Sequence, residues 1–342
     1  MTFRLRSFFL LVLVLVPFLH VSAVQALTVS PVKLELTGDP GQTLTGTFDL
    51  YNEQAQATTF YVSTANFEAE GETGTPKFVE SAEGLASWIT VEAGREVVTL
   101  DTDQTQTVNY QVTIPSDADP GGYFAAIFWG TSPETSEYEK QLSLGAKVGI
   151  LMLLTVSGEV DLEGGLLEFD TQDSQRVFTE VPVGFYYRFQ NAGSDRILPT
   201  GTVDLYNTLG IQTDSIVANE AEGNILPSSI RRFEETWGAA SSEEVDGFWS
   251  HVRAQWQNFA FGYYKADLHL SYDGPQSYEK ASVGFWVIPW QLILVVTLTT
   301  LFALGSLRIA VLRYNKWIIA SALGAQKKPQ NKKKSKSKKK TV

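Results

Sequence analysis

Residues 43–51, with the sequence TLTGTFDLY, indicate the fold class of this chain. Apolar or small residues alternate with polar ones: Leu44, Gly46, Phe48 and Leu50 against Thr43, Thr45, Thr47 and Asp49. Successive side chains of a β-strand point to opposite faces of a sheet. The stretch therefore predicts a strand with one buried face and one face in water.

Similar strand patterns lie on both sides of this stretch. Short or alternating runs occur at residues 28–36, 58–65, 88–91, 96–100 and 105–114, and continuous apolar runs at 123–130 and 147–156. Pro31 suits an edge strand, because proline has no N–H for a ladder hydrogen bond. Clusters such as 38–41 (GDPG) mark the turns. Seven or eight strands in about 130 residues predict a β-sandwich of the immunoglobulin class.

The second half of the chain repeats this organisation after residue 158. We expect strands at residues 165–169, 181–191, 201–206, 211–217, 229–236, 262–272 and 278–287. The predicted fold is all-β: two tandem immunoglobulin-like β-sandwiches, a short inserted helix and one C-terminal transmembrane helix. The predicted divisions are a signal peptide (1–26), two sandwiches (27–158 and 159–286), a span (287–307) and a basic tail (308–342).

One insertion in the second half has helical spacing. Ser241 and Glu244 form a capping box, and Trp249, Val252, Trp256 and Phe259 then recur on one helical face. The spacing predicts a helix near residues 242–259. Its aromatic stripe either packs on its own sandwich or forms a binding face (Trp249, Trp256, Phe259) for a partner or for lipid headgroups.

Residues 281–307 carry no charge and separate two regions of opposite charge. Residues 27–280 hold all 38 acidic side chains and have a formal charge of −25, whereas residues 308–342 have +12. A helix over 287–307 is about 31 Å long, enough to cross a bilayer. Aromatic side chains mark both predicted membrane interfaces: Trp286, Trp290, Tyr314 and Trp317. The charge asymmetry predicts a cytoplasmic C-terminus and an extracellular N-terminal part in the plasma membrane.

The N-terminus reads as a secretory signal. Arg4 and Arg6 precede an apolar run at residues 8–19, and Val24 and Ala26 suit cleavage before Leu27. An uncleaved anchor is the alternative, although 12 residues are short for a span.

The tail is rich in lysine and is expected to be disordered from about residue 326. It begins with Lys327, Lys328, Lys332, Lys333 and Lys334. Basic runs bind phosphates, but this tail follows the span closely and has no interleaved aromatic residues. We therefore expect topology control and attraction to the inner leaflet, with no nucleic-acid partner.

Composition argues against most catalytic chemistry. The chain has no cysteine, and only His251 and His269 remain after signal removal, so neither a thiol nucleophile nor an ordinary zinc site is expected. No nucleophile elbow, phosphate loop or dinucleotide fingerprint is present. Loop aspartates at 101, 103, 117 and 119 suit either Ca²⁺ or ordinary turns. We predict no cofactor, no resident metal and no enzyme activity.

Three aromatic residues are predicted to be architectural. Tyr123 follows the turn at residues 120–122, where a tyrosine hydroxyl commonly bonds to the backbone. Trp88 and Trp129 are interpreted as core or edge anchors.

Several stretches resemble bacterial envelope proteins with immunoglobulin-like domains. They are residues 27–36 (LTVSPVKLEL), 40–45 (PGQTLT), 51–52 (YN), 191–193 (NAG), 199–201 (PTG) and 226–228 (LPS), followed by Arg231 and Trp237. Together with the span and the lysine tail, they resemble the family of the WxL-interacting surface proteins. That resemblance implies two domains that bind envelope components, one in contact with peptidoglycan and one with a partner. It assigns no binding residue, and the aromatic helix has no counterpart in it.

These observations favour a non-enzymatic, single-pass surface protein that binds or scaffolds cell-wall polymer or partner proteins. An accessory subunit of a membrane complex is a second hypothesis, because the span contains small and polar residues. An envelope hydrolase is a third, and it would require a pocket with converging carboxylates. The sequence does not determine the oligomeric state.

Overall fold

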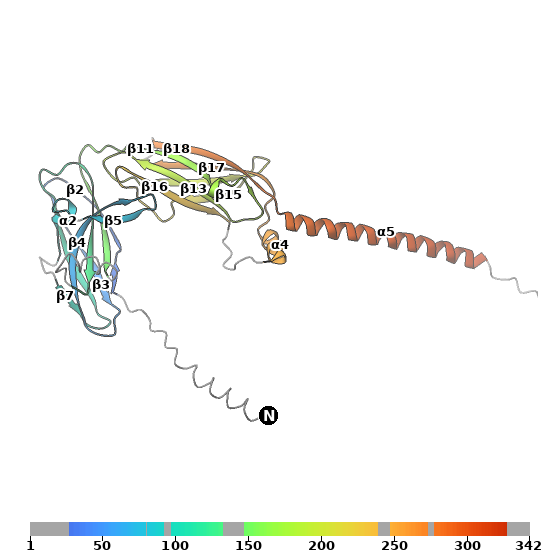
Figure 1. Cartoon of the computed structure of the whole chain (residues 1–342), viewed down its shortest axis with the longest axis horizontal. Coiled ribbons are helices and arrows are strands. Elements are labelled where there is room, and N and C mark those ends of the chain that lie inside the picture. Colours follow the sequence, from blue (N-terminus) through green and yellow to red (C-terminus); the bar gives the residue numbers. More distant parts are fainter. Residues whose placement is uncertain are drawn as a thin grey trace, which may run out of the picture.

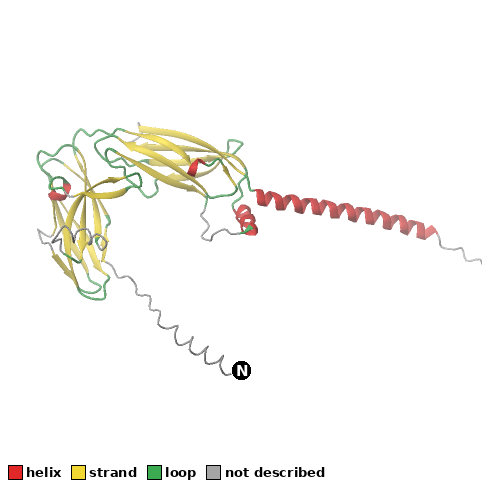
Figure 2. Ribbon diagram, in the orientation of Figure 1, coloured by secondary structure: helices red, strands yellow, loops and turns green. Residues whose placement is uncertain are grey.

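The computed structural model describes residues 27–79, 81–91, 97–132, 147–238, 247–272 and 277–326. These residues form two β-sandwiches that meet at an elbow, and a long helix leaves the far end of the second sandwich (Figures 1 and 2). The architecture confirms the predicted all-β, immunoglobulin-like class. The predicted signal peptide, the capping box at Ser241 and Glu244, and the lysines from Lys327 onward lie outside the described residues.

The first sandwich has two facing sheets. One has the order β1 (Leu27–Ser30), β3 (Thr43–Asn52), β8 (Thr105–Thr113), β6 (Ile89–Val91). The other has the order β2 (Lys33–Gly38), β10 (Val148–Val156), β9 (Gly121–Gly130), β4 (Thr58–Glu70), β5 (Thr75–Val79), and β7 (Val97–Leu100) also pairs with β4. The helix α2 (Leu85–Trp88) precedes β6. Phe48 and Trp129 pack edge to face in the core between the sheets.

The second sandwich is built in the same way. One sheet has the order β11 (Gly164–Thr171), β13 (Val183–Asn191), β16 (Ser229–Trp237). The other has the order β12 (Val177–Phe178), β18 (Ser277–Val287), β17 (Gly262–Tyr272), β14 (Thr200–Tyr206), β15 (Gln212–Ala218). A 3₁₀ turn, η4 (Gln172–Ser174), follows β11. Phe185, Phe285 and Tyr264 stack in its core.

The strand predicted at residues 28–36 is two strands. β1 pairs with β3 in one sheet, whereas β2 runs parallel to β10 in the facing sheet. The chain changes sheets around Pro31. Proline has no ladder donor, so it suits this break between two pairings. Trp88 belongs to α2 and the following strand starts at Ile89, which also corrects the prediction.

Two longer helices lie at the far end of the second sandwich (Figure 1). α4 (Phe248–Gln257) is shorter than predicted at its C-terminal side, because Asn258 and Phe259 are not helical. α5 (Trp290–Gln326) begins after the predicted residue 287, since Val287 still pairs with Gly262 in the sheet. Ile288 and Pro289 are the whole connection between β18 and α5. By length and composition, the helix over residues 290–321 contains a stretch apolar enough to cross a membrane.

Candidate functional site

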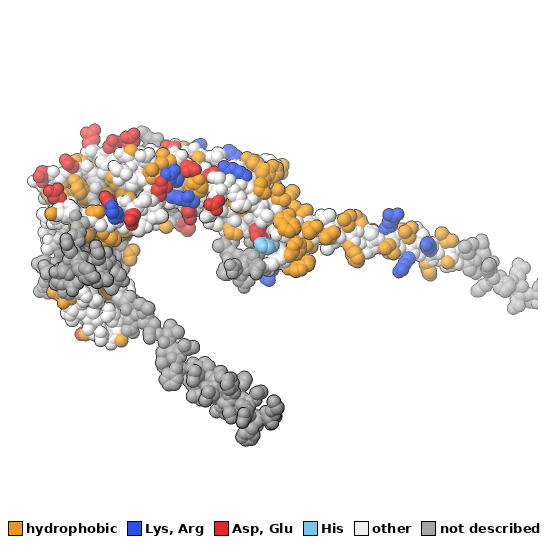
Figure 3. Space-filling view, in the orientation of Figure 1, with side chains coloured by type: hydrophobic (Ala, Val, Ile, Leu, Met, Phe, Trp, Pro, Cys, Tyr) orange, Lys and Arg blue, Asp and Glu red, His pale blue; other side chains and the backbone are white. Residues whose placement is uncertain are grey.

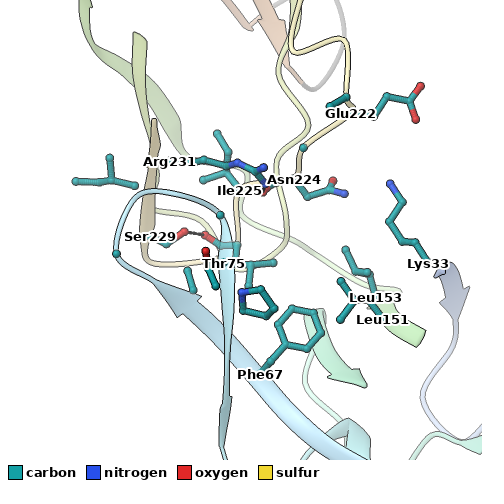
Figure 4. Close-up of a pocket in the computed structure, with 18 of the residues that line it drawn as sticks. Lys33, Phe67, Thr75, Leu151, Leu153, Glu222, Asn224, Ile225, Ser229 and Arg231 are labelled. Atoms are coloured by element: carbon teal, nitrogen blue, oxygen red, sulfur yellow. Dashed lines mark hydrogen bonds between the residues drawn. The ribbon is translucent and has the colours of Figure 1, made fainter. Parts of the chain in front are cut away.

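A cavity of about 500 Å³ lies where the two sandwiches meet (Figure 4). We call it the junction cavity. Its walls are the β4–β5 hairpin, the beginning of β2 with neighbouring β10, and residues 221–231 of the second sandwich. Ligand sites commonly have volumes of roughly 300–1,000 Å³ and lie between domains. The junction cavity fits that range.

The lining of the junction cavity is mainly apolar. Phe67, Leu151 and Leu153 line the side of the first sandwich, and Ile225 lies on the side of the second. Leu151 and Leu153 are at alternate positions of β10, so they share one face of the sheet. This apolar floor would hold side chains of similar character.

Arg231 supplies the main polar feature of the cavity wall. Its Nη1 donates to the carbonyl of Asn224 at 2.8 Å, and its guanidinium lies 5.1 Å from the ring of Phe233. Among the described residues, its hydrogen-bond partner is thus a neutral carbonyl. Burial lowers the pKa of Arg231, which shows that the cation is partly desolvated there. An anionic or carbonyl group entering the cavity would offset that cost.

The other cation at the cavity already has a partner. Lys33 Nζ lies 2.8 Å from Glu35 Oε1, and this contact is the main reason why the pKa of Glu35 lies below its usual range. Glu35 also contacts Arg196 at 3.5 Å and Asn224 at 3.4 Å, both in the second sandwich. This cluster therefore ties the sandwiches together beside the cavity.

The β4–β5 hairpin forms a first bracket between the sandwiches. Glu72, in its tip, accepts from Arg188 Nε at 2.7 Å and from Arg188 Nη2 at 2.5 Å. The Glu72 carbonyl also accepts the backbone N–H of Arg232, on the edge of β16, at 2.7 Å. The guanidinium of Arg188 lowers the pKa of Glu72, and the carboxylate in turn raises the pKa of Arg188. A bidentate pair of this kind fixes orientation as well as distance.

A second bracket lies where the chain passes from the first sandwich to the second. Arg196 and Asp195 both contact the hydroxyl of Thr155, each at 2.8 Å. The Gly122 N–H donates to the Ser194 carbonyl at 2.9 Å. A Cβ at Gly121, where φ is +137°, would lie 2.7 Å from that carbonyl, so this approach requires glycine. With a bracket on either side, the junction cavity is held open by the fold itself.

The predicted aromatic binding residues lie at the opposite end of the second sandwich. Trp249 and Trp256 are each 70% exposed and Phe259 is 65% exposed, so the stripe does not pack on its own sandwich. The buried side of α4 instead holds Gln255, and His251 Nδ1 lies 2.8 Å from Glu180. Trp256 and Phe259 line a hollow beside the first turns of α5, whereas Trp249 packs on Phe248.

The predicted membrane-interface aromatics are also exposed. Trp286 and Trp290 flank the start of α5, and Tyr314 stacks on Trp317 near its other end. Trp290 contacts Phe248 of α4, with ring centroids 6.1 Å apart. Their assignment to the membrane interface stays a prediction.

The architectural predictions are confirmed. Tyr123 Oη donates to the Asp119 carbonyl at 3.1 Å, and Trp88 packs on the Tyr123 ring. Trp129 is buried in the core.

The aspartates considered for Ca²⁺ serve in turns, where the Asp103 N–H donates to Asn52 and Gln104 to Asp101. Among the described residues, no three His, Asp or Glu side chains could together hold a metal ion.

A second hollow, of about 730 Å³, runs along the edge of β16 and includes Glu220, Glu234 and Glu235. Burial raises the pKa of Glu235, and its Oε1 accepts the Asn219 N–H at 2.7 Å. That bond anchors the loop after β15, so Glu235 has a structural task here.

No family model matches the chain, and no curated protein matches it in sequence. Solved structures with a similar fold include three chaperones. The class 5 fimbriae chaperone CfaA is 12% identical, with a TM-score of 0.34 over 75% of this chain and 98% of that chain. The CupB2 chaperone of Pseudomonas aeruginosa is 6% identical, with a TM-score of 0.32 over 76% and 100%. The E. coli chaperone DraB is 11% identical, with a TM-score of 0.32 over 77% and 96%. At these values the likeness transfers no partner to this chain.

Proposed function

We propose that this chain is a non-enzymatic, membrane-tethered binding protein whose two-sandwich part captures a segment of an envelope protein in the junction cavity. The observation that carries the proposal is the cavity itself: it is bracketed on both sides, lined by apolar side chains, and carries the partly desolvated cation of Arg231. Apolar walls favour a protein segment over a polysaccharide, which would need many polar partners.

The proposal places the chain in the plasma membrane with α5 as a single span. The signal peptide is removed before Leu27, the acidic sandwiches are outside, and the basic tail is in the cytoplasm. The exclusion of charge from residues 281–307 and the reversal of charge across them support this topology. The resemblance to WxL-interacting surface proteins agrees with it, and a role as an accessory subunit remains compatible with the same cavity.

The test uses the full chain in detergent or nanodiscs, incubated separately with cell-wall polymer and with envelope proteins. We expect retention of a protein, and a loss of affinity of about tenfold or more in Arg231→Ala, because a charge-assisted hydrogen bond is removed. Ala69→Phe, which fills the cavity, should have the same effect.

Arg232→Ala is the matched control, since its guanidinium stacks on Tyr186 instead of entering the cavity wall. If the wild-type chain retains neither polymer nor protein, the binding function is wrong. Equal retention by all variants would show that binding occurs elsewhere.

A further inference from the structure

Exposed apolar side chains of the second sandwich gather at the end from which α5 leaves (Figure 3). Leu209, 80% exposed, lies in the β14–β15 turn. Thr208 Oγ1 accepts the Tyr263 N–H at 3.0 Å, which places that turn beside the start of β17. Phe261 and Trp286 flank the same end. Such a concentration on an otherwise acidic surface marks an interaction face.

A groove of about 570 Å³ separates α4 from α5 at this end. Trp256, Phe259 and Phe261 form one wall, and Leu292, Ile293 and Val296 form the other. The walls carry almost no polar surface, so water molecules inside the groove would find few hydrogen-bond partners.

The side chain of Gln255 holds the two walls of the groove together through hydrogen bonds. Its Oε1 accepts the Leu292 N–H at 2.9 Å, and its Nε2 donates to Gln291 Oε1 at 2.5 Å. Both glutamines are buried. These bonds give a partner to both amide oxygens and to the Leu292 N–H, which lowers the cost of burying those groups beside apolar side chains.

The position of α5 across a bilayer determines how deep in the lipid the groove lies. Trp290 and Tyr314 are 24 residues apart in the chain, and a centred hydrocarbon layer of about 30 Å takes about 20 helical residues, close to 292–311. Leu292, Ile293 and Val296 would then lie in the outer part of the hydrocarbon layer. The aromatic wall, which shares the groove with them, must reach the same depth.

The charge of this segment agrees with a lipid surface. Residues 247–266 contain no Asp or Glu and include Arg253 and Lys265, within a region whose formal charge is −25. Anionic headgroups would repel acidic side chains. Residues 247–266 lack acidic side chains, although the rest of residues 27–280 is rich in them. Tryptophan and phenylalanine beside a cation are the residues that interfacial helices present to a membrane.

We propose that α4 and the adjoining end of the second sandwich dock on the lipid leaflet on the ectodomain side, and that an acyl chain of that leaflet fills the α4–α5 groove. This inference rests on the proposed membrane span of α5. We choose lipid as the occupant because α5, the proposed membrane span, forms one wall of the groove. The contact adds a second attachment and holds the second sandwich against the bilayer.

The natural chain has no cysteine, so single cysteines give unambiguous labels. We would attach an environment-sensitive fluorophore to Trp256→Cys and Phe261→Cys in the full chain and reconstitute it into phosphatidylcholine vesicles. Phe302→Cys, on the exposed face of α5, reports the span, and Val217→Cys, an exposed apolar position of β15, is the matched aqueous control. Nitroxide-labelled acyl chains and iodide serve as the lipid and aqueous quenchers.

We expect nitroxide lipids to reduce emission at 256 and 261 about as strongly as at 302, and iodide to quench strongly only at 217. Iodide quenching at 256 and 261, with 302 in lipid, would overturn the docking proposal and leave the span intact. Labels shielded from both quenchers would mean that protein, such as a second copy, covers the groove, which also overturns it. Iodide quenching at 302 would overturn the span and the docking together.

Discussion

Glu72 is the residue on which the first bracket depends. Arg188 lowers the pKa of its carboxylate, so the ionised form is favoured in the folded protein. A lowered pKa contributes stability above the ordinary glutamate pKa of about 4.3, and the contribution disappears as the pH falls through the folded-state value.

We therefore predict that Glu72→Gln lowers the thermal midpoint at neutral pH and that the difference from wild type vanishes in acid. Thermal melts across the pH range measure this. Glu68→Gln is the control, because Glu68 pairs with Lys77 within the same hairpin and does not reach the second sandwich. A difference of equal size at low pH would show that the loss comes from packing and not from charge.

Buried asparagines explain two of the sequence stretches that resembled envelope proteins. Asn52 Nδ2 donates to three backbone carbonyls, and Asn191 Nδ2 donates to those of Asp195 and Ile225. Asn191 is fully buried. These side chains give buried turn carbonyls a donor in addition to the backbone hydrogen bonds of the same turns. Such motifs report the fold and carry little information about a ligand.

Asn191→Ala should destabilise the second sandwich by about 1–3 kcal/mol, because the Asp195 carbonyl and the Gly193 N–H lose the buried amide and the Ile225 carbonyl keeps only the Ile197 N–H. Denaturant unfolding measures the change, followed by intrinsic fluorescence in a variant that keeps Trp237 as its single tryptophan, with and without Asn191→Ala in that background. Gln190→Ala, exposed on the same strand, should have little effect. Equal stability of the Asn191 variant would mean that water replaces the amide.

At the scale of elements, one buried polar side chain joins α4 to α5. Gln255 is the buried link to α5, through the Leu292 N–H and Gln291. We predict that Gln255→Ala releases α4 and speeds amide exchange over residues 248–257, while exchange in β17 stays unchanged. Hydrogen–deuterium exchange with mass spectrometry measures both. Gln257→Ala, exposed at the end of α4, should match wild type. Unchanged exchange in Gln255→Ala would show that contacts between aromatic rings are enough to hold α4 on α5.

Most strands could be predicted because their signal is local. Alternation in 43–51, and apolar runs bounded by turn residues at 123–130 and 147–156, depend only on the periodicity of side chains. The short strands β5 and β12 have no such pattern and exist because they pair with β4 and β18. The change of sheet near Pro31 likewise depends on which remote strand each half pairs with.

The aromatic face of α4 and the junction cavity also differ in whether their residues are close together in the sequence. The aromatic residues of α4 could be singled out because they recur within one segment. The junction cavity could not, since Lys33, Phe67, Leu151 and Arg231 come from four distant parts of the chain. Arg231 drew attention only through a resemblance, and nothing local indicated that it would be partly buried without a carboxylate.

At the scale of the whole molecule, the two brackets predict a fixed elbow between the sandwiches. Spin labels at Val97→Cys and Val217→Cys, one on each sandwich, should give a narrow distance distribution by pulsed electron resonance. Combining Glu72→Ala with Arg196→Ala removes the arginine side-chain contacts of both brackets and should broaden it. Glu68→Ala should leave it narrow. A broad distribution in the wild-type chain would show that the sandwiches move independently and that the junction cavity is not preformed.

The connection between β18 and α5 has a mechanical consequence. The Ile288 N–H donates to the Phe178 carbonyl at 2.8 Å, and the Pro289 carbonyl accepts the Ile293 N–H at 3.0 Å, so both linking residues are hydrogen-bonded. A pull on the distal sandwich cannot be absorbed by stretching a tether. In the proposed topology, we expect a force on the second sandwich to be transmitted to α5 as a tilt or a rotation of that helix.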